Sequence, residues 1–341
     1  MVLFSQRVLT TQRSTFPAQF TFAKEFEIKQ ESNLIPANSL ECLKLCDEDS
    51  GIDGGVEETT HIWVILKTKG ELLSTNEAGS ETSAVQINLP FEWSADGAKS
   101  AVVQGKLHFF GGFDDSKRIA ILDACNYEVL PYKLNFNYAS GQAALSISDD
   151  SEALICFDTT NFISCEVFTG SSVFSTYSTS YSHFQGGLGF YNGQPITVGG
   201  IHPDGHRKVE TLSSTGWTSL ADSPKNYHGH MLVGLGNDLL MIGGRDPDAD
   251  YAPQRDVWRL RDNNWSQEPD LKQKVYYGSA IASGNRIFIA GGFDESSTSF
   301  YQRIHLEEND EIASVEEIGI LDQYYGAPPL FATSEDICVS N

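Results

Sequence analysis

Apolar runs that each end in a pair of glycines recur along the chain. Four such runs are present: Leu107–Gly112, Pro195–Gly200, Leu239–Gly244 and Ile287–Gly292. The second glycines stand at 112, 200, 244 and 292, so the gaps between them are 88, 44 and 48 residues. A gap of 88 equals two periods of 44, which predicts a degenerate copy at Glu152–Asp158, where Cys156 and Phe157 replace the glycine pair.

A single glycine keeps the same phase as these pairs. It opens another apolar run 13 or 14 residues before the first glycine of each pair. These opening glycines are Gly97, Gly186, Gly229 and Gly278, while Gly141 opens the degenerate copy and Gly326 a final one. Two landmarks in register over six copies indicate a chain built from internal repeats.

Each repeat has the pattern of β-strands. Its apolar runs are short, rich in β-branched and aromatic residues, and separated by turn signals. The copy Tyr227–Leu271 predicts four strands, at Gly229–Val233, Leu239–Gly243, Asp256–Leu260 and Trp265–Glu268. Four antiparallel strands in a unit of this length are typical of one blade of a β-propeller. We label the predicted strands of each unit a, b, c and d.

In the best copies, four apolar residues are followed by a glycine pair, then by a polar loop, an aromatic residue such as Trp258, and a closing Trp217 or Trp265. The repeats resemble those of the kelch family. The resemblance implies an all-β, kelch-type propeller. Glycine lets inner strands approach where a Cβ atom would clash, and the late tryptophan can fill the space between neighbouring sheets. The repeat glycines with this structural role are Gly111, Gly112, Gly199, Gly200, Gly243, Gly244, Gly291 and Gly292.

Counting repeats predicts seven four-stranded blades in a single domain spanning 16–341, with residues 1–15 outside it. The blades are expected near 39–95, 97–138, 141–183, 186–224, 229–271, 278–322, and 326–341 completed by 16–30. In the first blade the strands are expected at Ser39–Leu45, His61–Lys67, Ser83–Leu89 and Phe91–Trp93. Six blades with an N-terminal extension is the alternative.

The last copy has room for only two strands, at Pro328–Ala332 and Asp336–Val339. An open ring would leave an unpaired sheet edge. The segment Phe20–Ile28 has nearly alternating apolar residues, as a strand would. We therefore expect Phe16–Lys29 to supply outer strands to the C-terminal blade.

Antiparallel strand order places the d–a loops between blades and the b–c loops within blades on one face, which we call the loop face. Aromatic residues precede the opening glycines, and acidic residues follow the glycine pairs. The candidate binding residues are Tyr227, His228, Tyr276, Tyr277, Tyr324, Tyr325, Arg245, Asp114, Asp246 and Asp294. They predict a shallow bowl, aromatic inside and acidic outside, that binds a protein. The alternative is that the tyrosines only line the channel mouth and the aspartates only solvate turns.

Charge limits the partners. The 23 Lys and Arg stand against 46 Asp and Glu, a net charge of -23. Nucleic-acid binding needs clustered cations, so that class is excluded, whereas an acidic surface would steer a basic protein partner. No run of about 18 apolar residues is present, and we expect no membrane span. We expect a monomer.

The six cysteines are too sparse for a small disulfide scaffold. Cys42 and Cys46 lack a nearby His or second cysteine pair, so no zinc site is expected. Cys156 and Cys165 could cross-link paired strands in a secreted protein, although buried free thiols are the simpler expectation. Polar residues interrupt the first 16 positions. A cytoplasmic protein is therefore expected, with an extracellular one as the alternative.

The function expected from these patterns is a non-catalytic protein-interaction module. The alternative is a secreted carbohydrate-binding or carbohydrate-active propeller enzyme, because the family that the chain resembles includes copper sugar oxidases and sialic-acid mutarotases. His228 and His230 would share one face of a strand, but no cysteine motif for such a copper site accompanies them. No catalytic residue, cofactor or metal is assigned.

Overall fold

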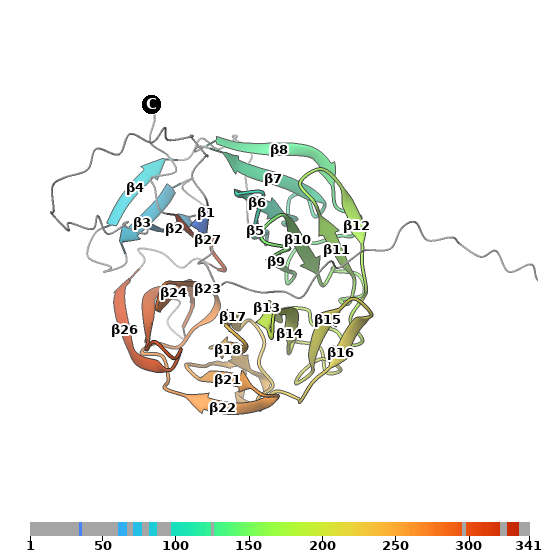
Figure 1. The fold of residues 1–341 in the computed structure, drawn as a ribbon. Helices are drawn as coiled ribbons and strands as arrows, with labels where there is room; N and C mark the ends of the chain where they lie inside the picture. The colour runs from blue at the N-terminus through green and yellow to red at the C-terminus, as the bar shows by residue number, and fades with distance from the viewer. Residues whose placement is uncertain are drawn as a thin grey trace, which may run out of the picture.

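The computed structural model describes residues 34–35, 61–66, 71–76, 82–86, 97–123, 126–294, 298–320 and 326–333. Their strands form sheets arranged as sectors of a ring around a central axis (Figure 1). The fold is the β-propeller that the repeats predict. Among the described residues the one helical element is a short 3-10 turn, η1 at Pro247–Ala249, and no helix is long and apolar enough to cross a membrane.

Five sheets are four-stranded antiparallel blades, numbered here in chain order. Blade 1 contains β5 (Lys99–Val103), β6 (Lys106–Phe110), β7 (Arg118–Asp123) and β8 (Asn126–Lys133). Blade 2 contains β9 (Ala143–Ile147), β10 (Glu152–Cys156), β11 (Cys165–Phe168) and β12 (Val173–Ser175). Blade 3 contains β13 (Gly187–Tyr191), β14 (Gln194–Val198), β15 (Val209–Ser213) and β16 (Gly216–Ser219).

The remaining two of these blades have the same order. Blade 4 contains β17 (Met231–Leu235), β18 (Asp238–Ile242), β21 (Val257–Arg261) and β22 (Asn264–Glu268), and its b–c loop holds the short pair β19 (Arg245–Asp246) and β20 (Ala252–Pro253). Blade 5 contains β23 (Tyr276–Ser283), β24 (Arg286–Phe293), β25 (Phe300–Leu306) and β26 (Ile312–Ile320). The four strands predicted in Tyr227–Leu271 are confirmed within two residues at each end.

The remaining sector of the ring holds a composite sheet in the order β1-β27-β2-β3-β4. Its strands are β1 (Leu34–Ile35), β27 (Leu330–Thr333), β2 (His61–Leu66), β3 (Glu71–Asn76) and β4 (Thr82–Gln86). Strand β27 pairs antiparallel with β2 and parallel with β1. The C-terminal strand β27 thus takes the place of strand a, and β2, β3 and β4 from the first part of the chain take the places of strands b, c and d.

The prediction of seven blades is not supported by the described strands, which form five blades and the composite sheet. The predicted first and last blades share this one sheet, because 326–333 supplies one strand and 61–86 supplies three. Strand c is Glu71–Asn76 rather than Ser83–Leu89. Several predicted segments lie outside the described residues: 1–15, Phe16–Lys29, Ser39–Leu45, Phe91–Trp93 and Asp336–Val339. Closure by the N-terminal strands stays a prediction.

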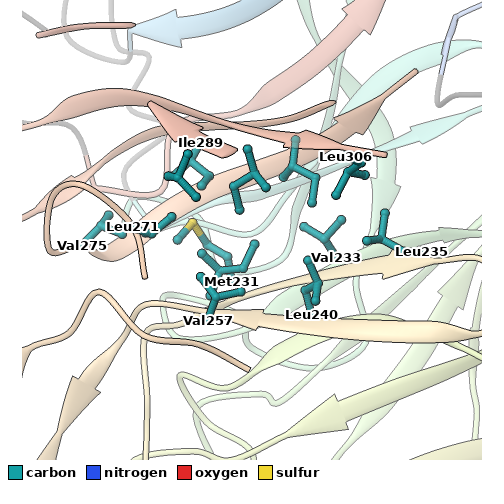
Figure 2. Packing of buried hydrophobic residues seen from close by; sticks show 13 residues of the cluster. Met231, Val233, Leu235, Leu240, Val257, Leu271, Val275, Ile289 and Leu306 are labelled. Carbon is teal, nitrogen blue, oxygen red and sulfur yellow. The ribbon is translucent and has the colours of Figure 1, made fainter. Parts of the chain in front are cut away.

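The hydrophobic core lies between blades. Figure 2 shows one cluster, in which Met231 and Val257 from blade 4 pack against Ile289 and Leu306 from blade 5. Comparable clusters join blades 1 and 2, 2 and 3, and 3 and 4. Trp217 and Trp265 pack at two of these interfaces, as the sequence predicts. Each blade therefore buries its faces only against its neighbours.

The glycine pairs permit a close approach of main chains. Gly111 has a φ of 71°, and a Cβ atom there would lie 2.0 Å from the Tyr138 carbonyl oxygen, at the entry to the next blade. Gly243 has a φ of 61° and would meet the Val275 carbonyl oxygen at 2.4 Å. In the degenerate copy Phe157 adopts a φ of 71° at the corresponding position. The residues that replace the pair are therefore Phe157 and Asp158, one position later than predicted.

A buried ionic network joins blades 4 and 5 on the face opposite the loops. Arg259 is 1% exposed. Its Nη1 donates to Asp238 Oδ2 at 2.9 Å, its Nε to Glu268 Oε1 at 2.6 Å, and its Nη2 to the Asp310 carbonyl oxygen at 2.8 Å. Removing this guanidinium would leave Glu268 without its counter-charge, and Asp238 would be paired only with the more exposed Arg261.

We expect Arg259→Ala to lower the free energy of unfolding by about 3 kcal/mol, because it leaves the largely buried Glu268 carboxylate unpaired. Urea unfolding of the full chain measures the change. Lys208→Ala is the matched control, since its ion pair with Asp222 lies at the surface and is expected to contribute little to stability. Equal effects of the two substitutions would contradict the structural role of Arg259.

Candidate functional site

A ring of left-handed residues surrounds the axis on the loop face. At the start of each innermost strand, or within a few residues before it, one residue has a φ between 44° and 77°. These residues are Gly97, Gly141, Gln185, Gly229, Tyr277 and Ala327, and we call them the axial ring. Gly97, Gly141 and Gly229 are predicted opening glycines, whereas the other three members are neighbours of Gly186, Gly278 and Gly326.

Hydrogen bonds run from blade to blade through the axial ring. The backbone N–H of Gln185 donates to the Gly141 carbonyl at 2.8 Å, and that of Gly229 to the Gln185 carbonyl at 2.7 Å. Tyr277 donates to Gly229 at 2.7 Å, and Ala327 to Tyr277 at 2.5 Å. From Gly141 to Ala327, these bonds fix the main chain where the d–a loops enter the innermost strands.

An aromatic and cationic group lies beside the axial ring. We call His228, Arg245, Tyr251, Tyr276 and Tyr277 the mouth cluster. The Arg245 guanidinium lies 4.5 Å from the ring centroid of Tyr276 and 5.8 Å from that of Tyr251. His228 packs edge-on against Tyr251 and Tyr277, with centroids 5.9 and 6.2 Å apart. Four of these residues were predicted, and Tyr251 was not.

Tyr277 holds its place in the mouth cluster through contacts to two other blades. Its ring covers Gly229, where a Cβ atom would come within 2.7 Å of the ring. Its hydroxyl donates to Gln185 Oε1 at 2.5 Å. Burial raises the pKa of Tyr277 to about 12, so the phenol is neutral at physiological pH. The contacts indicate a rigid aromatic wall at the channel mouth.

Arg245 is the cation of the mouth cluster. Its Nε donates to the Tyr251 carbonyl oxygen at 2.7 Å, and no carboxylate among the described residues forms an ion pair with it. Burial, with a smaller contribution from the nearby Arg245 charge, lowers the pKa of His228 to about 4. His228 is therefore neutral near pH 7, and Arg245 supplies the positive charge at this position.

The other predicted site residues have mixed positions. Tyr227 is buried at 1% exposure, and its hydroxyl donates to Asp256 Oδ2 at 2.6 Å. Asp246 is buried and accepts a hydrogen bond from the Asp248 backbone N–H, as a turn-building residue does. Asp114 is exposed, and Asp294 is partly exposed and bonded to the Thr298 N–H. Tyr324 and Tyr325 lie outside the described residues.

A second aromatic group lies at blades 2 and 3. Phe162 stacks on His202 with centroids 4.3 Å apart, and its ring centroid is 4.8 Å from that of Phe184. Phe184 also covers Gly141 of the axial ring. Exposed Phe113 contacts Gly97 in the same manner. Aromatic side chains therefore border the axial ring at several blades.

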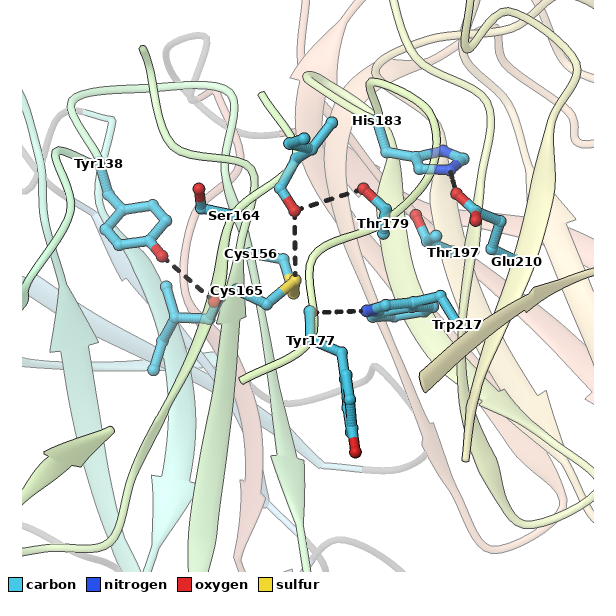
Figure 3. The surroundings of a disulfide bond; sticks show 12 residues. Tyr138, Cys156, Ser164, Cys165, Tyr177, Thr179, His183, Thr197, Glu210 and Trp217 are labelled. Atoms are coloured by element: carbon cyan, nitrogen blue, oxygen red, sulfur yellow. Dashed lines mark hydrogen bonds and ion pairs between the residues drawn. A yellow bond between two sulfur atoms is a disulfide. The ribbon is translucent and has the colours of Figure 1, made fainter. Parts of the chain in front are cut away.

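The loop that carries Phe162 is closed by a disulfide. Cys156 ends β10 and Cys165 begins β11, directly opposite each other, and their sulfur atoms are bonded (Figure 3). Both residues are buried. From the sequence alone, buried free thiols are the simpler expectation for these cysteines. The structure instead shows the disulfide that was the alternative. The disulfide fixes the base of a b–c loop on the loop face.

A buried pair, His183 and Glu210, anchors the neighbouring d–a loop (Figure 3). His183 Nε2 lies 3.0 Å from Glu210 Oε2, and Nδ1 lies 2.7 Å from the Gly199 carbonyl oxygen. Burial alone would raise the pKa of Glu210, but hydrogen bonds from His183 and the Ser180 N–H outweigh it and hold this pKa below its usual value. The carboxylate therefore stays ionised inside the fold.

An axial cavity of about 180 Å³ opens inside the ring of innermost strands. Its lining includes the second residue after each axial-ring position: Lys99, Ala143, Gly187, Met231, Ser279 and Pro329. Lys99 is the charged member of this set. The sequence analysis missed it, although aligning the repeats on their opening glycines would show one lysine where the other copies have small or apolar residues.

Lys99 is partly buried and lines the cavity. Burial lowers its pKa from 10.5 to about 8. Among the described residues no ion pair or hydrogen bond holds the amine. His230 also lines the cavity, and burial, followed by the neighbouring His228, lowers its pKa to about 3. Lys99 is thus the cation of the described lining, while the ring nitrogens of His230 are buried away from the cavity space.

We expect wild-type stability to rise relative to that of Lys99→Met as the pH increases from 8 to 10.5. The folded pKa lies below the unfolded value, so the unfolded chain binds more protons in this window and loses that advantage above it. Thermal unfolding midpoints of both proteins across this range measure the effect. Lys106→Met is the control, because Lys106 pairs with Asp123 at the surface. A constant difference between wild type and Lys99→Met would contradict burial of the ammonium.

Replacing both disulfide cysteines by alanine is expected to lower the free energy of unfolding by roughly 2–3 kcal/mol, since the unfolded chain loses a short closed loop. Urea unfolding of oxidised wild type and of Cys156→Ala/Cys165→Ala measures it. Dithiothreitol should lower the wild-type midpoint and leave that of the double variant unchanged. Free thiols at both positions in purified protein, detected by mass spectrometry under non-reducing conditions, would contradict the bond.

Among the described residues no three or more His, Cys, Asp or Glu side chains gather as a metal site would require. No family model matches the sequence, and no curated protein matches it. A solved structure titled "Structure of YjhT", also of propeller type, is similar with a TM-score of 0.58 and 14% sequence identity, over 72% of this chain and 91% of that one. At this identity the similarity supports the β-propeller fold alone.

Proposed function

We propose that this chain is a kelch-type β-propeller that binds a protein partner through its loop face without catalysing a reaction. The observation that carries the proposal is the mouth cluster, in which Arg245 stacks on Tyr251 and Tyr276 beside the axial ring. Tyr and Arg are the residue types that dominate binding energy at protein interfaces. Arg245 is held by its hydrogen bond to the Tyr251 carbonyl oxygen, and Tyr277 by its hydrogen bond to Gln185. Side chains that are positioned before binding lose little entropy on association.

The surrounding charge favours a basic partner. Asp114, Asp204, Asp248 and Asp250 are exposed on b–c loops, and the chain carries a net charge of -23. An acidic field of this kind steers basic proteins towards the loop face, whereas the aromatic centre supplies the short-range contacts. Arg245 would then donate hydrogen bonds to a polar or acidic group of the partner at the centre of the interface. We propose that the chain acts as a monomer.

A cytoplasmic location is part of this proposal, and the disulfide supports the alternative. Structural disulfides form and persist mainly in oxidising compartments. A secreted propeller whose aromatic residues bind a carbohydrate would use the same mouth cluster and the stack formed by Phe162 and His202. This second function predicts saturable binding of a defined glycan and no stable protein partner.

Affinity purification with mass spectrometry, followed by direct binding measurements, tests the proposal. We expect Arg245→Ala and Tyr276→Ala each to weaken binding of a purified partner by about 30-fold or more. Lys106→Ala and Tyr132→Ala are the controls, because Lys106 forms a surface ion pair at an a–b turn on the opposite face and Tyr132 lies on an outer strand. These controls should retain wild-type affinity.

Two outcomes would contradict the proposal. Partners that bind both mouth-cluster variants as tightly as wild type would show that another surface is used. A specific hit on a glycan array that is lost with Tyr276→Ala, together with no protein partner, would favour the carbohydrate-binding alternative.

A further inference from the structure

Arg245 differs from the other arginines nearby in having no carboxylate partner among the described residues. The ion-paired arginines of blades 4 and 5 are Arg255, Arg259, Arg261 and Arg303. Arg245 instead donates from Nε to the Tyr251 carbonyl oxygen, and its guanidinium lies over two aromatic rings. Its two Nη groups have no hydrogen bond within the part of the chain that the structure describes. They are therefore available to an acceptor supplied by another molecule.

Two carboxylates lie on the same b–c loop and still do not pair with Arg245. Asp248 lies in η1 and Asp250 directly follows this turn, and both side chains are exposed. The base of the loop is the short strand pair β19 and β20, and the bond from Arg245 Nε to Tyr251 closes it a second time. The loop therefore presents one positive and two negative charges at separate, fixed positions.

The immediate surroundings of Arg245 are uncharged. His228 is 1% exposed, and its low pKa of about 4 keeps the imidazole neutral near pH 7. The Tyr277 phenol is neutral as well and is bonded to Gln185. Arg245 is thus the single charge of the mouth cluster, and no cation beside it competes for an arriving anion.

A guanidinium in this environment is suited to a carboxylate. Aromatic rings interact with the flat faces of a guanidinium, whereas its N–H groups point outward in the plane and can bind both oxygens of a carboxylate. The rings of Tyr251 and Tyr276 and the bond from Nε hold the group before a partner arrives. An acidic side chain of the partner could therefore bind to the Nη groups without reordering Arg245.

Resting on the proposed protein-binding function, we infer that the partner segment at the mouth carries an Asp or Glu side chain bound to Arg245 and, within three residues of it, a Lys or Arg side chain bound to Asp248 or Asp250. Three residues separate Arg245 from Asp248, so their Cα atoms lie at most about 11 Å apart. Three residues of an extended partner chain cover the same span.

Charge complementarity favours this mixed pattern over a segment of one sign. A purely basic segment would place a like charge on Arg245, and a purely acidic one would meet Asp248, Asp250 and the field of a chain with net charge -23. A carboxylate flanked by a cation satisfies both parts of the loop. The partner is thus basic overall but presents an acidic side chain at the centre of the contact.

A phage-displayed library of random dodecapeptides, selected at pH 7 on the immobilised full chain, tests the inference. Peptides fused at their C-termini to the coat protein have no free terminal carboxylate, so any carboxylate that is selected belongs to a side chain. We expect the enriched peptides to share an Asp or Glu with a Lys or Arg within three positions. In a selected peptide, replacing the acidic side chain by its amide should weaken binding about tenfold or more, because a charged hydrogen bond is lost.

Variants of the chain then identify the residue that reads the carboxylate. Arg245→Gln should bind the acidic and the amide peptide with equal affinity, and Arg245→Glu should prefer a peptide with Lys at that position. Lys106→Gln is the control, because Lys106 lies at an a–b turn on the opposite face, and it should discriminate between the peptides as wild type does. Circular dichroism and thermal unfolding establish that each variant is folded.

The outcomes separate this inference from the proposal on which it rests. Enriched peptides that require Tyr276 but contain no acidic residue would overturn the inference and leave the protein-binding proposal standing. Undiminished discrimination by folded Arg245→Gln, or no enrichment of any peptide on wild type, would also overturn it. Peptides that bind Tyr276→Ala and Arg245→Ala as tightly as wild type would count against both, since another surface would then be used.

Discussion

The burial of each sheet's faces against its neighbours is the constraint on which the rest of this structure depends. A four-stranded sheet has two faces and no interior, so Met231 and Val257 of blade 4 become buried only when Ile289 and Leu306 of blade 5 cover them. Apolar clusters of the same kind fill the interfaces between blades 1 and 2, 2 and 3, and 3 and 4. Because every sheet is twisted and needs partners on both sides, the sheets pack face to face around an axis.

That arrangement brings the innermost strands together, and it explains the glycines and the axial ring. Chains that converge on an axis leave no room for a Cβ atom at Gly111 or Gly243, where the next blade's carbonyl group is close. The d–a loops then meet around the axis and bond through their main chains, from Gly141 to Ala327. A candidate binding surface thus results from packing, because the same loops place aromatic side chains beside the axial ring.

Electrostatics gives the two candidate sites different characters. At the mouth, Arg245 is stacked on aromatic rings at a partly exposed position, where it can reach a large partner. In the cavity, Lys99 is partly buried, and this burial lowers its pKa to about 8. Elsewhere cations such as Arg259 are paired with carboxylates and hold neighbouring blades together. Arg259, which lies between blades, is therefore used for stability, whereas Arg245 and Lys99, which lie near the axis, have no carboxylate partner among the described residues.

The sequence by itself determined the fold class, the repeat length and the strands of the best copies, because the apolar runs and glycine pairs recur in phase. It also placed His228, Arg245, Tyr276 and Tyr277 on the loop face, since strand direction alone assigns the d–a and b–c loops to one side. Burial of Tyr227 and Asp246, however, was not visible in the sequence. Tyr227 lies between two residues that are also buried, Asn226 and His228, whereas Asp246 follows the partly exposed Arg245, and only packing decides such differences.

Tertiary structure alone decided the arrangement of the chain ends, the disulfide and the cavity. Strand β27 pairs with β2 although more than 250 positions separate them, and repeat counting carries no information on such a pairing. Cys156 and Cys165 are bonded because the register of β10 and β11 places them opposite each other. Lys99 became a candidate only when the six innermost strands were brought around one axis, because a local pattern records which residue follows a glycine and not what surrounds it.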